Sequence, residues 1–272
     1  MRDFQVSLAI DKTQVARQFS RAASHYRQAS EVQNRMADQL VDLIPATSKT
    51  PKRIIDLGCG AGYLLERLIQ EFPGAELYGL DLAAGMIEAS EGYLAVGKTA
   101  RSSPLFIQGD MESLPLVENS FDLVFSNAAL QWTDCKKSLA EITRVLAPGG
   151  IAILATFVDG TLAEWRAALA DVGLNALHQL PDAEYLSEIA ASEGLDLAYN
   201  HCSTYQIDHL TARELLESTK RMGATNAHRQ RSKGMLGRQT YLDLLTALET
   251  QFPELDYAST YQANYLVLRK AV

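Results

Sequence analysis

The sequence predicts an α/β fold, in which a doubly wound sheet of mainly parallel strands is covered by helices on both faces. From residue 53 onward, short apolar runs typical of buried strands alternate with segments whose apolar residues recur at helical spacing. The first run ends in a glycine-rich turn that opens a helix, and acidic residues follow the next two runs. Because parallel strands require crossover connections, this alternation predicts helices on both sides of the sheet.

The first 48 residues are expected to form a helical arm. Between Thr13 and Ile44, apolar residues recur at helical spacing with polar residues between them, which predicts one or two helices. Pro45 and Pro51 flank a short linker, and a buried strand follows it. We therefore place residues 1–48 in the arm and residues 49–272 in one large α/β domain.

Strands and helices alternate over the rest of the chain. The apolar runs predict strands at Arg53–Leu57, Glu76–Leu80, Leu105–Gln108, Phe121–Ser126, Ile151–Phe157, about Leu197–Ile207, and Ser259–Arg269. The helical patterns predict helices at Gly62–Glu71, Ala84–Ala95, Lys136–Leu146, Leu162–Val172, Ala183–Ser192, Ala212–Met222 and Gln239–Gln251. Residues 147–150, Ala-Pro-Gly-Gly, predict a turn before the fifth strand. The last two helices, within about residues 208–252, are expected to form a small helical insertion on the substrate side.

Composition and charge narrow the functional class. The chain carries 25 Lys and Arg against 33 Asp and Glu, and its net charge of −8 argues against a dedicated nucleic-acid binder. The longest mainly apolar run, Ile151–Val158, is too short to span a membrane. Cys59, Cys135 and Cys202 are scattered and show no CxxC spacing, which indicates neither a disulfide framework nor a metal site. We therefore expect a cytoplasmic, monomeric protein that binds no metal.

The segment Asp56-Leu57-Gly58-Cys59-Gly60-Ala61-Gly62 joins the first strand to a helix. Glycines at alternate positions let the backbone approach a ligand closely and adopt positive φ angles. The segment lacks the complete GxGxxG spacing of a dinucleotide site, because Tyr63 occupies the last position, and no P-loop lysine follows. A tight turn alone would explain one or two glycines, whereas Asp56 and the acidic residues downstream favour a ligand site.

Polar residues also follow the next three strands. Asp81 closes the second strand about 20 residues beyond the glycines, the distance at which doubly wound folds present a carboxylate to ribose hydroxyls. Asp110 follows the third strand, and the fourth ends in the small and polar residues of 126–132. Because the carboxyl ends of parallel strands meet at one edge of the sheet, these residues predict a site for an adenosine ligand.

Together these elements resemble the class I S-adenosylmethionine-dependent methyltransferases, and the resemblance covers roughly residues 50–160. It implies a seven-stranded Rossmann-like methyltransferase sheet with an antiparallel final strand, and S-adenosylmethionine as the cofactor. The residues that it assigns to the cofactor are Asp56, Gly58, Cys59, Gly60, Gly62, Asp81, Leu82, Met86, Asp110, Met111, Asn127 and Ala128.

The same resemblance implies a role for each part of this set. The three loop glycines pass under the methionyl part, and Asp56 supports the loop. Asp81 holds the ribose, while Asp110 and Met111 flank the adenine. Leu82 and Met86 line the nucleoside pocket, although a core position explains either one equally well. Asn127 and Ala128 border the sulfonium and the methyl acceptor.

Two further motifs lie outside the cofactor segment, in the arm and near the C-terminus. The arm contains Phe19-x-Arg-Ala-Ala-x-x-Tyr26, and the later segment contains Lys220-x-x-Gly-Ala-Thr225. With the 126–132 segment, they resemble the malonyl-acyl carrier protein O-methyltransferases of biotin synthesis, over nearly the whole chain. The resemblance implies methylation of the free malonyl carboxylate on malonyl-acyl carrier protein, or on malonyl-coenzyme A. Because a carboxylate is already ionised at neutral pH, this transfer needs no general base.

The arm is expected to act as a lid over the cofactor. Tyr26, Phe19 and His25 are its candidates for contact with the site, with Tyr26 as a catalytic residue beside Asn127; simple packing is the other explanation for the two aromatic residues. His25 would suit a general base for a hydroxyl or carbon acceptor, but an isolated surface histidine explains it as well. Gln131 and Trp132 are expected on the substrate side.

Basic residues suggest where an acidic carrier protein would bind. No acidic residue lies between Glu217 and Asp243, a stretch that contains six basic residues, among them Lys220, Arg229 and Arg231. Residues 12–27 of the arm are also free of acidic residues. Such a surface would steer an acidic partner, although most charged stretches are simply solvated. An arginine suits the malonyl carboxylate, and Arg144 is a candidate catalytic residue for this contact.

Three alternatives remain open at this point. A trans-aconitate-type carboxyl methyltransferase is the nearest, since it has a similar Asn-x-x-x-Gln-Trp segment. A quinone-ring carbon methyltransferase would need an apolar entrance facing a membrane, which the sequence does not display. Proteins resembling the complex I assembly factors share the cofactor fold, but no transit peptide is visible here.

Overall fold

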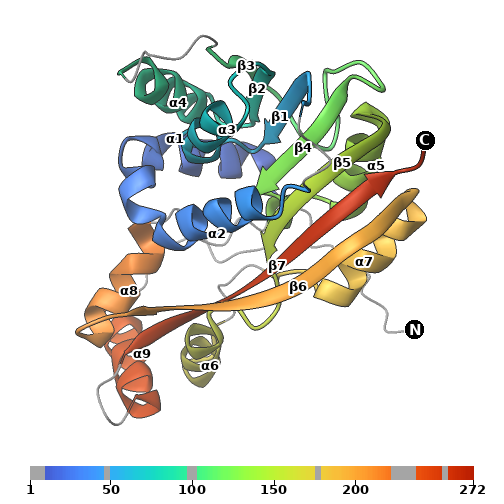
Figure 1. The fold of residues 1–272 in the computed structure, drawn as a ribbon. Coiled ribbons are helices and arrows are strands. Elements are labelled where there is room, and N and C mark those ends of the chain that lie inside the picture. The colour runs from blue at the N-terminus through green and yellow to red at the C-terminus, as the bar shows by residue number, and fades with distance from the viewer. Residues whose placement is uncertain (1–9, 46–49, 97–102, 175–178, 222–236, 253–256) are drawn as a thin grey trace.

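The fold was analysed in a computed structural model, which describes residues 10–45, 50–96, 103–174, 179–221, 237–252 and 257–272. In these ranges seven strands form one sheet in the order β3-β2-β1-β4-β5-β7-β6. The strands are β1 (Arg53–Leu57), β2 (Glu76–Asp81), β3 (Leu105–Gln108), β4 (Phe121–Asn127), β5 (Leu146–Phe157), β6 (Leu195–Asp208) and β7 (Ala258–Lys270). Figure 1 shows the twisted sheet running through the molecule.

The directions of the strands confirm the predicted fold class. Strands β1 to β5 pair in parallel, whereas β7 lies antiparallel between β5 and β6. The connecting helices are α3 (Tyr63–Glu71), α4 (Ala84–Val96), α5 (Cys135–Val145), α6 (Ala163–Asp171) and α7 (Ala183–Ser192). A short 3-10 helix, η1 (Leu130–Trp132), follows β4. All seven predicted strands and these helices are present, with shifts of a few residues at some ends.

Alternation along the central strands separates two apolar cores. In β4, Leu123 and Phe125 pack with side chains from α2, α3 and α6, whereas Val124 packs with side chains from α5 and α7. Successive residues of a strand point to opposite faces, so a strand buried on both sides is apolar at every position. Helices therefore cover both faces of the sheet, as the apolar runs predicted.

The arm forms two helices, α1 (Lys12–Ala29) and α2 (Glu31–Asp42). The Asp11 side chain caps α1 by accepting a hydrogen bond from Gln14 N at 3.1 Å. Helix α1 packs against α4, and Gly85 N donates to Ser20 Oγ at 3.3 Å. Helix α2 lies across the sheet in Figure 1, with Met36 fully buried in the larger core. Since α2 shares this core, the division of the chain at residue 48 stays a prediction.

One predicted turn lies inside a strand. Residues 147–150 belong to β5, where the pairing with β4 shifts between Phe121 and Leu123. Gly149 has a φ of +75° within this bulge. The Pro-Gly-Gly sequence does bend the chain as expected, but pairing with the neighbouring strand resumes on both sides of the bend.

Between β6 and β7, the described residues form two helices, α8 (Ala212–Arg221) and α9 (Arg238–Gln251). Leu215 of α8 and Leu244 of α9 belong to the larger core, and α8 also packs against α1. The expected insertion therefore lies beside the arm in the part that the structure describes (Figure 1). Within that part, no helix has the length and apolar character needed to cross a membrane.

Candidate active site

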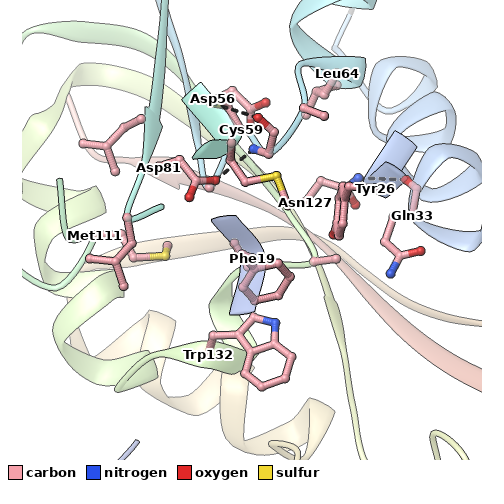
Figure 2. A pocket seen from close by; sticks show the side chains of 18 of the residues that line it. Phe19, Tyr26, Gln33, Asp56, Cys59, Leu64, Asp81, Met111, Asn127 and Trp132 are labelled. Atoms are coloured by element: carbon pink, nitrogen blue, oxygen red, sulfur yellow. Dashed lines mark hydrogen bonds between the residues drawn. The ribbon is translucent and has the colours of Figure 1, made fainter. Parts of the chain in front are cut away.

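A pocket opens at the carboxyl edge of the sheet, below the arm. Its empty volume is about 950 Å³ with the open mouth included. The ends of β1, β2 and β4 and the residues after β3 form one side, which we call the floor. Residues of α1 and α2 form the other side, the roof (Figure 2).

The glycine turn fixes the floor through backbone geometry. Gly58 N and Cys59 N both donate to Leu80 O, at 2.7 and 3.0 Å, which ties the turn to the end of β2. Gly58 has a φ of +76°, and a Cβ on it would lie 2.3 Å from Ala129 Cβ. Only glycine fits this position without displacing its neighbour.

The other two glycines have different surroundings. Gly60 also has a positive φ, and a Cβ there would lie 3.5 Å from Tyr26 Cε1, so the loop approaches the roof. Gly62 does not line the pocket, because its α carbon faces α4, where an added Cβ would lie 2.3 Å from Ser90 Oγ. The prediction that Gly62 contacts the cofactor is therefore replaced by a role in packing α3 against α4.

Asp81 stands between the turn and the pocket. Its Oδ2 accepts a hydrogen bond from Gly60 N at 2.9 Å, and its Oδ1 accepts one from Ala83 N at 2.8 Å. Burial raises the pKa of this carboxyl to about 6, although its backbone hydrogen bonds act in the opposite direction. A carboxylate held in this way retains lone pairs for hydroxyl donors on a ligand.

Asp56 is a second buried carboxyl in the floor. Burial, and then the neighbouring charge of Asp81, raise the pKa of Asp56 to about 8. Its Oδ1 atom is buried and accepts no hydrogen bond from the residues that the structure describes. A cationic donor bound in the pocket would supply that hydrogen bond and favour the ionised form.

The far end of the floor carries Asp110 and the buried Met111. The ammonium group of Lys12, the first residue of α1, lies 2.7 Å from Asp110 Oδ1 and 2.7 Å from Glu112 Oε1. These ion pairs are partly buried and attach the start of the roof to the floor. Asp110 therefore contacts the arm and also borders the part of the pocket where the adenine is expected.

Aromatic rings form much of the roof. Phe19 packs edge-on against Tyr26 and Trp132, with ring centroids 5.9 and 5.6 Å apart (Figure 2). Burial raises the pKa of Tyr26 to about 12, so its hydroxyl stays protonated at neutral pH. Phe19 and Tyr26 of the roof, together with Trp132 of η1, thus present an apolar surface that excludes water from this part of the pocket.

The end of β4 joins floor to roof. The Asn127 side chain donates through Nδ2 to Gln33 O at 2.8 Å. The Oδ1 atom of Asn127 and the Oε1 atom of Gln33 are buried, and neither accepts a hydrogen bond from a described residue. Ala128, next along the chain, has a φ of +51°, a conformation that costs free energy outside glycine.

The pocket gathers most of the predicted site residues. Those that line it are Phe19, Tyr26, Asp56, Gly58, Cys59, Gly60, Asp81, Leu82, Met86, Asp110, Met111, Asn127, Ala128 and Trp132. They come from α1, β1, β2, α4, β4 and η1 and from the turns that follow the first four strands, which explains why no single motif contains them all.

Four other predicted residues lie elsewhere or cannot be placed. His25 is exposed on α1 and does not line the pocket. Lys220 lies in the last turn of α8, but its side chain is not described. Arg229 and Arg231 lie outside the described residues.

Two predictions are corrected by the hydrogen bonds that the side chains make. The guanidinium of Arg144 donates to Glu141 Oε1 at 2.7 Å and to the carbonyl oxygens of Leu116 and Leu114 at 2.8 and 3.1 Å, so it holds a loop and does not reach the pocket. Gln131 is buried behind the pocket wall, where it accepts from Thr156 Oγ1 at 2.7 Å. Gln131 therefore supports the end of β4 from behind.

Sequence reasoning missed several polar residues of the pocket, among them Lys12, Arg27, Gln33 and Asn34. Lys12, Phe19, Tyr26 and Gln33 are spaced seven residues apart, which is close to two helical turns and places the first three on one face of α1. The seven-residue spacing of Phe19 and Tyr26 could therefore have predicted Lys12 and Gln33 as further pocket residues. No group of three or more metal-ligating side chains occurs in the described ranges.

Comparison with known proteins identifies the class to which this fold and pocket belong. The methyltransferase domain family matches residues 55–154, which span the floor from β1 to β5. The crystal structure of the Bacillus subtilis protein YcgJ has the same fold, with a TM-score of 0.62 at 17% identity over 86% of this chain and 99% of that one. The chain is therefore a methyltransferase built on this doubly wound fold.

Relatives that match nearly the whole of this chain narrow the class to a family. The chain is 35% identical to a malonyl-[acyl-carrier protein] O-methyltransferase of Hahella chejuensis, over 95% of this chain and 91% of the relative. It is also 32% identical, over 95% of its length, to 47% of a biotin biosynthesis bifunctional protein of Teredinibacter turnerae. The chain belongs to the malonyl-[acyl-carrier protein] O-methyltransferase family.

Proposed function

We propose that this chain transfers the methyl group of S-adenosylmethionine to the free carboxylate of a malonyl group on acyl carrier protein. The observation that carries the proposal is the similarity to O-methyltransferases of this name along the arm and the sheet alike. The ester product carries no charge at that end, so enzymes that elongate ordinary acyl chains would accept it. The relationship to a biotin biosynthesis protein supports a place for this step in biotin synthesis.

The residues of the pocket fit S-adenosylmethionine at both ends. Asp81 offers acceptor sites for ribose hydroxyls, and Asp110 with Met111 would bound the adenine. At the other end, three buried oxygens lack donors among the described residues, namely Asp56 Oδ1, Gln33 Oε1 and Asn127 Oδ1. All three residues line the pocket, and acceptors grouped in this way fit the ammonium of an amino acid, because each gains a charge-assisted hydrogen bond from it. The bound cofactor would supply a methyl group activated by a positively charged sulfur.

The chain has little chemistry to perform besides positioning. A malonyl carboxylate is ionised at neutral pH and attacks without losing a proton, so no base is required. Transfer neutralises a negative carboxylate and a positive sulfur together, and low-polarity surroundings favour a reaction that removes charge. Phe19, Tyr26 and Trp132 provide such surroundings, and the arm, which carries Phe19 and Tyr26, would act as a lid that excludes water and aligns the acceptor. We therefore assign the arm to lid closure, with Tyr26 at its centre.

The exposed side of the arm suits an acidic carrier protein. Arg17 and Arg21 are exposed one turn apart on α1, a helix without acidic residues. Helix α8, which packs against α1, carries Lys220 at its end, and Arg229 and Arg231 follow in the sequence. We propose that these basic residues guide the carrier to the pocket mouth by long-range attraction, despite the overall negative charge.

Side-by-side assays test the function. The purified protein with labelled S-adenosylmethionine is expected to methylate malonyl-acyl carrier protein, with malonyl-coenzyme A a poorer substrate and free trans-aconitate poorer still. Equal rates with carrier protein and coenzyme A would remove the carrier from the proposal. Faster methylation of trans-aconitate than of either malonyl thioester would show that the proposed acceptor is wrong.

Charge variants test the docking surface separately. Replacing Arg17 and Arg21 with Gln should raise KM for malonyl-acyl carrier protein more than KM for malonyl-coenzyme A, and should flatten the salt dependence of the carrier reaction. The same pair of assays applies to Arg229→Gln with Arg231→Gln. A KM that changes equally for both substrates would show a merely solvated surface.

A further inference from the structure

Arg27, near the end of α1, is held against the pocket wall by an aromatic and acidic cage. Its guanidinium carbon lies 3.3 Å from the ring centroid of Tyr93 and 4.9 Å from that of Tyr63. Its Nη2 atom pairs with Glu66 Oε2, and Tyr93 Oη donates to Glu66 Oε1 at 3.0 Å. These contacts fix the plane of the guanidinium before any ligand binds.

The cage leaves one nitrogen for an outside partner. Nη1 of Arg27 is buried and donates to no acceptor among the described residues, although the side chain lines the pocket. A buried charged donor without an acceptor costs free energy, so a fixed guanidinium of this kind favours an anion. Glu66 pairs with the opposite nitrogen, Nη2, so Nη1 still lacks an acceptor among the described residues.

Two carboxylates would enter this pocket, the α-carboxylate of the cofactor and the carboxylate of the acceptor. The acceptor carboxylate loses its charge as the methyl group is transferred. A direct ion pair would stabilise it more before the reaction than in the transition state, and would therefore slow the transfer. The cofactor carboxylate keeps its charge throughout, so an arginine there improves binding without that penalty.

The surroundings of Arg27 favour the same choice. Tyr63, on which the guanidinium stacks, is the first residue of α3 and directly follows the glycine turn. Asp56, Gln33 and Asn127 also line the pocket, and each has a buried oxygen that accepts no hydrogen bond from a described residue. Acceptors for an ammonium and a donor for a carboxylate in one pocket match the zwitterionic end of an amino acid.

We infer that Arg27 binds the α-carboxylate of the methionyl part of S-adenosylmethionine. This inference rests on the cofactor named in the proposed function and is independent of the methyl acceptor. Arg27 is then a binding residue that the arm contributes to the cofactor site, and closure of the arm is coupled to cofactor binding.

The test compares two ligands that differ by one carboxylate. Binding of S-adenosylmethionine and of decarboxylated S-adenosylmethionine, which keeps the ammonium and the sulfonium, is measured by calorimetry without any acceptor. The wild-type protein should prefer the carboxylated ligand by about 10- to 100-fold, the range for a buried charge-assisted contact. In Arg27→Gln this preference should fall to within about 3-fold, while the decarboxylated ligand binds with nearly wild-type affinity.

Control variants keep the result interpretable. Arg21→Gln, on the exposed face of the same helix, should leave the preference unchanged. Arg27→Lys should keep part of the preference, because lysine keeps the positive charge but lacks the paired N–H donors of a guanidinium. Thermal melting of the ligand-free proteins shows whether each variant folds.

Different outcomes separate the possible failures. An unchanged ligand preference in a folded Arg27→Gln protein would overturn the inference. So would a variant with unchanged cofactor binding and a raised KM for malonyl-acyl carrier protein, which would assign Arg27 to the acceptor. Failure to methylate malonyl-acyl carrier protein would refute the proposed acceptor and leave the ligand preference as it stands.

Discussion

The floor and the roof of the pocket are built in different ways. Backbone groups fix the floor, since the glycine turn is bonded to β2 and Asp81 is bonded to the turn. Side chains on two helices form the roof, and their position depends on how α1 and α2 pack on the domain. Damage to the floor should therefore weaken cofactor binding, whereas damage to the aromatic part of the roof should mainly impair alignment of the acceptor.

The largest effect is expected for Gly58→Ala. The substituted Cβ would lie 2.3 Å from Ala129 Cβ at a φ of +76°. Strain and overlap should lower the free energy of unfolding by about 2–5 kcal/mol and S-adenosylmethionine affinity by about 100-fold or more. Gly92→Ala is the matched control, since nothing lies within 4 Å of its added Cβ in helix α4. Chemical denaturation and calorimetry measure both quantities, and normal binding by Gly58→Ala would show a floor that adapts.

The contrast between floor and roof also explains what the sequence could predict. Gly58, Gly60 and Asp81 are constrained by backbone conformation and strand ends, which leave a local pattern of residue types. The strands of the sheet were predictable for the same reason, because a strand buried on both faces must be apolar throughout. The bulge at Gly149 was not, since its local sequence is that of a turn and only the pairing with β4 distinguishes the two.

The roof depends on contacts between segments far apart in the chain. Whether Gln33 or Arg27 faces the pocket is decided by the docking of α1 and α2, which no local pattern encodes. Arg144 shows the reverse case, in which an arginine of the right type in a familiar segment makes only structural contacts. The residue types of Arg27, Gln33 and Arg144 indicate which contacts they can make, but not whether their side chains point into the pocket.

The next effect is expected for Asp81→Asn. The amide cannot accept from two ribose hydroxyls and two backbone donors as a carboxylate does, so cofactor affinity should fall by about 10- to 50-fold with the fold intact. Because burial raises the pKa of Asp81 to about 6, wild-type affinity should also fall as the pH drops below that value and the carboxyl takes up a proton. Affinity of the variant should lack this dependence. Calorimetry at several pH values measures both effects, and an unchanged affinity would contradict the ribose assignment.

The stability of the ligand-free protein should depend on pH in the opposite direction to cofactor affinity. A folded-state pKa above the unfolded value means that folding favours the protonated carboxyl, so this contribution is complete at low pH and is lost as the pH rises towards about 6. Asp81→Asn should reduce that loss. Denaturation curves across the same pH range provide the check.

A smaller effect on turnover is expected for Tyr26→Phe in the roof. The variant keeps the ring against Phe19 but loses a buried hydroxyl, so kcat with malonyl-acyl carrier protein should fall by about 3- to 10-fold while cofactor affinity changes by less than about 2-fold. Tyr199→Phe, on β6, is the control tyrosine. Deleting residues 1–30 is a blunter test, because it also removes Lys12 and Arg27 from the pocket. Equal losses of kcat and affinity in Tyr26→Phe would show that roof and floor act as one unit.

The smallest effect on catalysis is expected for Arg144→Ala. This guanidinium binds Glu141 and two loop carbonyls outside the pocket, so its removal leaves those acceptors without their donor and should lower the free energy of unfolding by about 1–3 kcal/mol. Values of kcat and KM for malonyl-acyl carrier protein, measured well below the melting temperature, should stay within about 2-fold of wild type. Glu141→Gln should reproduce the loss of stability, because it weakens the same contacts from the other side. If KM instead rises while stability is unchanged, Arg144 contributes to the acceptor site. A side chain that belongs to neither the floor nor the roof would then help to recognise the malonyl group.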